Sequence, residues 1–175
     1  MHQRTLEPAR PAGERRHPPW RLLVESRAPG VDIANDPDDR LTVRSAVMGG
    51  LAIERIDPFD GELGFSLVVR AGSTVYTAGA FGIDPDTLEI SPEVEVEVRQ
   101  AFANLEASLG MVGATLRDVV EMTTYLAGNH EEVYPVFQRV RSELMAGHLP
   151  ASTSVIVAGF LVPGMHLEMK AVAVA

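Results

Sequence analysis

The hydrophobic residues downstream of position 53 change their spacing along the chain, and each spacing predicts a kind of element. The run AIERI, 52–56, is where the mixture of apolar and polar residues typical of a folded domain begins. Two strand-like runs follow, GFSLVVRAG and STVYTAGAFGI. They meet at Ala71-Gly72-Ser73, small residues that favour a hairpin turn. We therefore expect antiparallel strands in this part of the chain.

Two later segments repeat their apolar residues at the helical period. The first, 91–113, opens with Ser91, a good N-cap residue, and ends at Gly110 or Gly113. Its EVEVEV run, 93–98, is interpreted as a solvated acidic edge. The second helix is expected within 129–147. The predicted buried faces consist of Val94, Val98, Ala101, Phe102, Leu105 and Leu109 in the first helix and Val133, Val136, Phe137, Val140 and Leu144 in the second.

Three more strands complete the pattern. One is predicted at 119–126 between the helices, and the others at 152–161 and 165–175, around the turn 162–164. The resulting order, β-β-α-β-α-β-β, predicts an α+β fold in which two helices pack on one face of a mixed sheet. The last strands are apolar on both sides, so the strand that follows the hydroxyls of 152–154 is expected to be buried. The second face of the sheet also needs cover, which predicts an oligomer.

Residues 1–48 differ in composition from the rest of the chain. They are rich in Pro, Arg, Asp and Gly and show no sustained hydrophobic period, which favours a disordered or loosely attached extension. Met48 lies where the patterned region begins. Two interpretations stay open: an extension that reaches over a neighbouring subunit, or a stretch upstream of the true start. The domain itself is placed at 53–175.

Charge and composition exclude several classes of function. Residues 49–175 carry seven basic against seventeen acidic side chains, a balance that disfavours nucleic acid as a partner. Cysteine is absent, which excludes disulfides and thiolate catalysis. The apolar runs are too short to span a bilayer and the N-terminus lacks the apolar core of a secretory signal, so we expect a cytoplasmic protein. The histidines show no metal-binding spacing and no strand leads into a glycine-rich phosphate loop, so neither a metal nor a cofactor is predicted.

Three segments carry a family resemblance, in the same order along the chain. They read GSTVYTAGAFGIDPDT, VRQAFANLEASLGMVGATLRDVVEMTTYL and LPASTSVIVAGFLVPGMHLEMKAVAVA. Together they resemble the RidA (YjgF-type) family of enamine/imine deaminases over about residues 53–175. The resemblance implies a chorismate-mutase-like fold, a homotrimer with a central β-barrel, and sites for a small-molecule substrate between subunits. It also implies hydrolysis of reactive enamines and imines to a carbonyl product and ammonia.

Two residues match family positions that act on the substrate. Glu168 matches the carboxylate that orients or activates the attacking water, a role that suits a general base. Taken as a residue alone, Glu168 also fits the exposed side of an end strand. Gly79 matches the glycine whose backbone lines the cleft, and it fits equally well a bulge or a close approach of two strands.

One departure from the family pattern concerns the substrate's carboxylate. Ser152 stands where the family has an arginine that binds this group. A hydroxyl gives one neutral hydrogen bond in place of a bidentate, charge-assisted pair. We therefore do not expect a simple α-imino acid as substrate unless another cation moves in. The nearby candidates are Arg70, Arg139, Arg141, Lys170, His148 and His166.

Other positions of the expected cleft also differ. Phe65 replaces a tyrosine and Ala80 a glutamine, while Gln138 falls near a helix asparagine of the family. Ser154 stands where many members have Thr or Cys. Together with Ser152, Thr153 either holds a polar ligand or satisfies the start of the strand. The substitutions favour a ligand less charged than an imino acid.

Two further interpretations remain open beside the deaminase. One is a non-catalytic trimeric module that binds small molecules or protects proteins, whose behaviour would be insensitive to Glu168→Ala. The other is a related hydrolytic or tautomerising reaction, which a requirement for a neutral ligand would distinguish.

Overall fold

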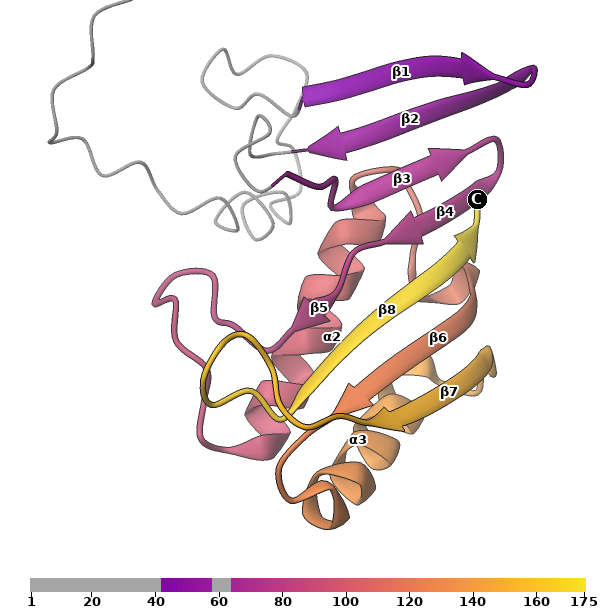
Figure 1. The fold of residues 1–175 in the computed structure, drawn as a ribbon. Helices are drawn as coiled ribbons and strands as arrows, with labels where there is room; N and C mark the ends of the chain where they lie inside the picture. The colour runs from indigo at the N-terminus through magenta and orange to yellow at the C-terminus, as the bar shows by residue number, and fades with distance from the viewer. Residues whose placement is uncertain (1–41, 58–63) are drawn as a thin grey trace, which may run out of the picture.

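The computed structural model of the protein describes residues 42–57 and 64–175 (Figure 1). A single sheet carries all the strands described there, in the order β1-β2-β3-β4-β8-β6-β7, with β5 paired to β8. The strands are β1 Thr42–Met48, β2 Leu51–Asp57, β3 Val68–Ala71, β4 Thr74–Thr77, β5 Ala80–Phe81, β6 Val119–Leu126, β7 Ala151–Ile156 and β8 Leu167–Val174; the helices are α2 Val94–Gly110, the short 3-10 helix η1 Leu116–Asp118 and α3 His130–Met145.

The predicted α+β fold with a mixed sheet is confirmed. Strands β6 and β7 run parallel, as a strand–helix–strand unit with α3 as its crossover requires. The other pairs are antiparallel. Figure 1 shows α2 and α3 on the same side of the sheet, so that none of the described helices covers the opposite face.

The sheet begins earlier than the boundary that the composition predicts. Residues 42–48, which we placed in the N-terminal extension, form β1 and pair along their whole length with β2. Gly49 and Gly50 join the two strands with φ values of 58° and 82°, as a two-residue hairpin turn requires. Strand β1 was missed because its described residues are exposed on both faces, so that no alternation of burial marks it. The run STVYTAGAFGI, expected as one strand, is divided into β4 and the short strand β5.

The expected burial of the strand after 152–154 is wrong for the single protomer. All six residues of β7 are exposed. The reason is topological: β7 is the edge of the sheet and has β6 alone as a neighbour. The last strand, β8, does not pair with β7 but inserts between β4 and β6. A row of unpaired backbone groups therefore borders one side of the sheet.

The core lies between the helices and one face of the sheet. The predicted helix faces supply it: Val98, Ala101, Phe102, Leu105 and Leu109 of α2 are buried, with Val133, Phe137 and Val140 of α3. Val94, Val136 and Leu144 pack against this cluster and stay partly exposed. On β8 the burial alternates strictly, so that Leu167, Met169, Ala171 and Ala173 face the helices.

An exposed ion-pair network ties the two helices together. Arg99 donates to Glu95, one turn earlier on α2, and to both carboxylate oxygens of Glu143 on α3. Arg139 of α3 donates to both oxygens of Glu95, at 3.2 and 2.7 Å. The hydrogen bonds from Arg139 and Arg99 lower the pKa of Glu95 to about 2. Each of these two arginines therefore has a carboxylate partner.

Candidate functional site

Gly79 and Glu168, both predicted as site residues, are in direct proximity. Gly79 precedes β5, and β5 pairs with β8 so that Phe81 lies opposite Glu168. A Cβ atom built on Gly79 would overlap with Oε1 and Cδ of Glu168. Glycine is therefore required for steric reasons: it allows the carboxylate to lie against the backbone between the two strands.

Glu168 is a partly buried carboxylate on the sheet face opposite the helices. Its neighbours along β8, Leu167 and Met169, point into the core, so the strand's alternation turns Glu168 outward. Desolvation by burial raises the pKa of its carboxyl above the ordinary value of 4.5. Among the described residues, no side chain hydrogen-bonds this carboxylate. It can therefore accept a hydrogen bond from water or from a ligand.

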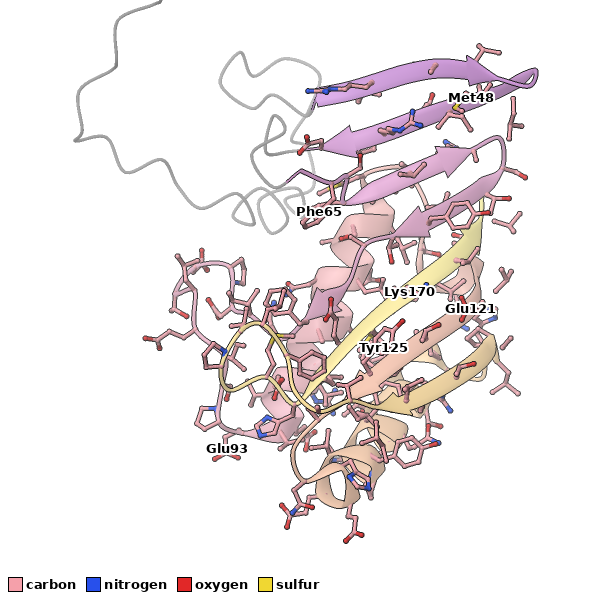
Figure 2. All side chains as sticks on the ribbon, viewed as in Figure 1. Met48, Phe65, Glu93, Glu121, Tyr125 and Lys170 are labelled. Atoms are coloured by element: carbon pink, nitrogen blue, oxygen red, sulfur yellow. The ribbon has the colours of Figure 1, made fainter. Side chains whose placement is uncertain are left out.

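Polar side chains extend from Glu168 across the same open face. Tyr125 of β6 lies opposite Glu168, and Thr123 lies opposite Lys170. In Figure 2, Tyr125, Glu121 and Lys170 lie on the viewer's side of the sheet, with the helices behind it. Thr123 donates to Glu121 at 2.7 Å. The open face thus combines carboxylates, hydroxyls and one ammonium group.

Ser152 lies on the other face of the sheet from Glu168. It pairs with Met122, which is fully buried beneath the helices, and therefore points to the helix side of β7. There Arg141 of α3 donates through Nη1 to Ser152 Oγ at 2.8 Å. Thr153 pairs with Thr123 and points to the open face. The predicted hydroxyl cluster is therefore divided between the two faces.

Ser154 and Gln138 belong to the helix side. Ser154 pairs with Thr124, whose hydroxyl oxygen is buried and has no hydrogen-bond partner in the described structure. Gln138 of α3 donates to the Tyr134 hydroxyl at 2.8 Å, while its own Oε1 is buried and likewise without a partner. Buried polar atoms without partners are uncommon and call for an explanation.

Phe65 and Ala80 occupy different environments. Phe65 is 53% exposed and precedes β3, close to where the Leu67 carbonyl accepts a hydrogen bond from the Ala78 amide at 2.7 Å (Figure 2). Ala80 is buried and pairs with Met169, so its side chain contacts the core and not an open surface.

Several of the candidate cations already have other partners. Arg70 donates to the carbonyl of Ala175, and Arg139 pairs with Glu95. The ring of His148 bonds the carbonyl of Val119 at 2.6 Å. Arg141 is the candidate that reaches Ser152, through the 2.8 Å hydrogen bond described above.

A buried carboxylate that the sequence did not reveal holds the start of β8. Glu97 is fully buried, which contradicts the expected solvated edge at 93–98. Its Oε1 accepts from the His166 amide at 2.8 Å, and its Oε2 lies 2.7 Å from His166 Nδ1. Both carboxylate oxygens of Glu97 are therefore engaged by the same residue, His166. Gly82 leaves the space for Glu97, since a Cβ there would overlap with its Cγ.

The sequence signal for this pair was weak. Glu97 and His166 are 69 residues apart, and Glu97 belongs to an acidic run whose neighbours are more exposed. The pair fixes the residue two positions before Glu168. It therefore holds the chain directly before β8, two residues from the carboxylate that lies against Gly79.

Within residues 42–57 and 64–175, no group of three or more His, Asp or Glu residues is arranged to hold a metal ion. In the same ranges no helix is long and apolar enough to cross a membrane.

Comparison with known proteins identifies relatives over the same region. The family model Endoribonuclease L-PSP matches residues 56–175, more than half of the chain. A RutC family protein from Pyrococcus abyssi is 31% identical over 110 residues, which cover 62% of this chain and 84% of that protein. The 2-iminobutanoate/2-iminopropanoate deaminase of Rattus norvegicus is 32% identical over 116 residues, with 63% and 79% of the two chains covered.

Solved structures agree with the sequence comparison. RidA from an Antarctic Psychrobacter species superposes with a TM-score of 0.59 at 28% identity and covers 63% of this chain and 88% of its own. TdcF from Escherichia coli, solved with bound serine, superposes with a TM-score of 0.56 at 26% identity and covers 63% and 87% of the two chains. Together with the family match, these similarities show that the chain belongs to the RidA (YjgF-type) family described by the Endoribonuclease L-PSP model.

Proposed function

We propose that the protein is a deaminase that hydrolyses reactive imines and enamines, with Glu168 as the base that activates water. The observation that carries the proposal is the partly buried Glu168 carboxylate, held against Gly79 without a described side-chain partner. Curated relatives with about 30% identity are named 2-iminobutanoate/2-iminopropanoate deaminases, which supports the reaction class.

The chemistry needs one water molecule and one proton acceptor. Glu168 takes a proton from the water as the water oxygen bonds to the imine carbon, and it returns this proton to the nitrogen to give a carbinolamine. Collapse of this intermediate transfers the hydroxyl proton to the nitrogen, forms the carbonyl, breaks the C–N bond and releases ammonia. A carboxylate whose pKa is raised by burial is a stronger base than an ordinary one, and its pKa is closer to neutral pH.

We further propose that the protein is a homotrimer with the sites between subunits. The open face of the sheet and the edge strand β7 support this. Large apolar residues are exposed on them in the protomer, among them Tyr76, Val120, Val155, Ile156 and Val174. An apolar surface of this kind on a single chain favours association, and closed cyclic assemblies are the common outcome.

Two observations bear on the charge of the substrate. The loss of an arginine at Ser152 favours a substrate other than a simple α-imino acid. On the other hand, TdcF was solved with serine, a ligand that carries a carboxylate. Arg141 lies beside Ser152 and places a cation at the position where the family arginine is missing.

The proposed function is tested by ammonia release from 2-iminopropanoate and bulkier imino acids generated in situ by an amino-acid oxidase. We expect the intact chain to accelerate hydrolysis above the baseline rate measured without protein, because Glu168 supplies a base for the attacking water. A rate equal to that baseline for every imine tested would contradict the proposal and favour the non-catalytic binding module.

A further inference from the structure

Arg141 has an unusual set of contacts for a surface arginine. Its Nη1 donates to Ser152 Oγ at 2.8 Å, and its Cζ lies 5.5 Å from the centre of the Phe137 ring. Both partners are neutral, so they orient the guanidinium group without neutralising its charge. Among the described residues, the one hydrogen bond of the guanidinium is that from Nη1 to Ser152, so its other N–H groups can bind an anion.

The other arginines of the helical layer differ in this respect. Arg99 and Arg139 each donate to carboxylates of Glu95 or Glu143. In the described part of the chain, Arg141 forms no salt bridge with an acidic side chain. It is therefore an oriented cation at the start of the exposed edge strand β7.

Polar groups continue from Arg141 along the interface between α3 and β7. Because β6 and β7 are parallel and α3 is the crossover between them, α3 runs opposite to β7. Moving from Arg141 back to Gln138 covers about 4.5 Å along α3. Because the two elements run in opposite directions, this is the same direction as moving from Ser152 forward to Ser154, which covers about 6.6 Å along β7.

Two buried side-chain oxygens, one on α3 and one on β6, lack a hydrogen-bond partner among the described residues. The Oε1 atom of Gln138 and the Oγ1 atom of Thr124 are buried without a hydrogen-bond partner in the described structure. Thr124 lies opposite Ser154 on β6. Leaving such atoms unpaired is unfavourable, so the region beneath α3 and β7 holds hydrogen-bonding capacity that the described residues do not use.

We propose that Arg141 is the residue that binds the carboxylate of the substrate, and that the substrate is therefore a 2-imino carboxylate. The Ser152 hydroxyl assists: it accepts the hydrogen bond from Arg141 and keeps its own hydrogen to donate to a carboxylate oxygen. The guanidinium thus reaches position 152 from the helix instead of from the strand. This inference rests on the proposed deaminase function and replaces the expected less charged ligand.

The placement also determines how the site is assembled. Ser152 and Arg141 lie on the helix side of the sheet, and Glu168 lies on the open side. A small imino acid cannot contact both faces of one sheet, so Arg141 of one protomer must act with Glu168 of another. The exposed edge strand β7 makes such an approach sterically feasible.

A binding measurement tests the assignment without requiring turnover. Pyruvate, the carboxylate-bearing product of 2-iminopropanoate hydrolysis, is titrated calorimetrically into the intact protein and two variants. We expect Arg141→Ala to weaken binding at least about tenfold, because a hydrogen-bonded charge pair is lost. The matched control is Arg139→Ala, which removes the same charge two residues away from an arginine already paired with Glu95. Equal affinities for wild type and Arg141→Ala, or an equal loss in both variants, would overturn the proposal.

Rescue separates carboxylate binding from a purely structural role. The double variant Arg141→Ala/Ser152→Arg returns a guanidinium to the same interface from the strand. We expect it to recover most of the pyruvate affinity and of kcat/KM for 2-iminopropanoate, whereas Arg141→Ala/Ser152→Ala stays weak. Equal weakness of both double variants contradicts the assignment.

The two proposals fail in different ways. Pyruvate binding that depends on Arg141, in a protein without deaminase activity, leaves the anchor intact and contradicts the proposed function. Deaminase activity that is insensitive to Arg141→Ala leaves the function intact and contradicts the anchor.

Discussion

The Glu168 carboxylate lies against the backbone of Gly79, in space that the side chain of any other residue would occupy. The two residues come from β8 and from the segment before β5, which the sheet places side by side. This contact desolvates one side of the carboxylate and holds its direction. The missing side chain at Gly79 thus affects both the position and the pKa of the proposed base, Glu168.

Replacement of Gly79 by alanine should therefore act through Glu168. We expect Gly79→Ala to displace the carboxylate and to lower kcat/KM by about tenfold or more, since a shift of about 1 Å is costly for a positioned base. The measurement is ammonia release from 2-iminopropanoate. Gly110→Ala is the control, because a Cβ at Gly110 meets no atom within 4 Å. If both variants react at the wild-type rate, Gly79 does not position Glu168.

The raised pKa of Glu168 predicts the pH dependence of the reaction. A base must be ionised, so kcat/KM should rise with pH through a pKa above the ordinary 4.5. The profile is measured after subtraction of the uncatalysed rate at each pH. The acidic limb should be absent from the residual activity of Glu168→Gln. If Glu168→Gln showed the same rise of kcat/KM with pH, the titrating group would be a residue other than Glu168.

The same pKa predicts an opposite trend for stability. The folded state holds the Glu168 proton more tightly than the unfolded state, so ionisation opposes folding. The free energy of unfolding of wild type should therefore fall relative to Glu168→Gln as pH rises from 4.5 through the raised pKa. Urea unfolding of both proteins across this interval gives the difference. A difference that does not change with pH would contradict the burial of the carboxyl.

Removal of the Glu97 side chain should loosen the start of β8. Glu97→Ala leaves a cavity and an unpaired His166 amide, which together cost about 2–4 kcal/mol of unfolding free energy. Glu97→Gln keeps an oxygen that can accept from the same amide, so its loss should be smaller. The control Glu93→Ala changes an exposed residue of the same acidic run and should stay within about 0.5 kcal/mol of wild type.

A positioning role for Glu97 also predicts a kinetic effect. If Glu97 fixes Glu168 through His166, Glu97→Ala lowers kcat more than it raises KM at a temperature where the variant is folded. A folded Glu97→Ala variant with the kcat of wild type would limit Glu97 to stability.

Mixed assemblies test whether each site uses two protomers. Arg141→Ala and Glu168→Gln are each expected to be weakly active alone. After co-expression, about one quarter of the sites should combine an intact Arg141 with an intact Glu168 if protomers assort at random. We therefore expect partial recovery of ammonia release from the mixture. If each site lay within one protomer, the mixture would be no more active than its components.

The elements with strong periodicity were predictable from the sequence. The helical faces around Phe102 and Phe137 and the alternation in β8 each bury one side, and burial of this kind leaves a direct trace in the pattern. Strand β1 left no such trace because its described residues are exposed on both faces. Its pairing with β2 depends on backbone hydrogen bonds, which any sequence can make.

The candidate site was predictable only in part. The family resemblance predicted Glu168 and Gly79 as site residues, and the structure brings the two together. The partners that depend on tertiary contacts were not predictable. Arg141 was one of several possible cations until α3 placed it on Ser152, and Glu97 belonged to a run that looked solvated. Long-range pairs of this kind leave no local pattern.

The central claim is that Glu168 activates water for imine hydrolysis, and one comparison tests it most directly. Ammonia release from 2-iminopropanoate is measured for wild type, Glu168→Gln and Glu121→Gln, the last being a carboxylate on the same face of the sheet. We predict that Glu168→Gln lowers kcat by about a hundredfold or more, as the loss of a general base does, while Glu121→Gln stays close to wild type. Equal activity of wild type and Glu168→Gln would contradict the account.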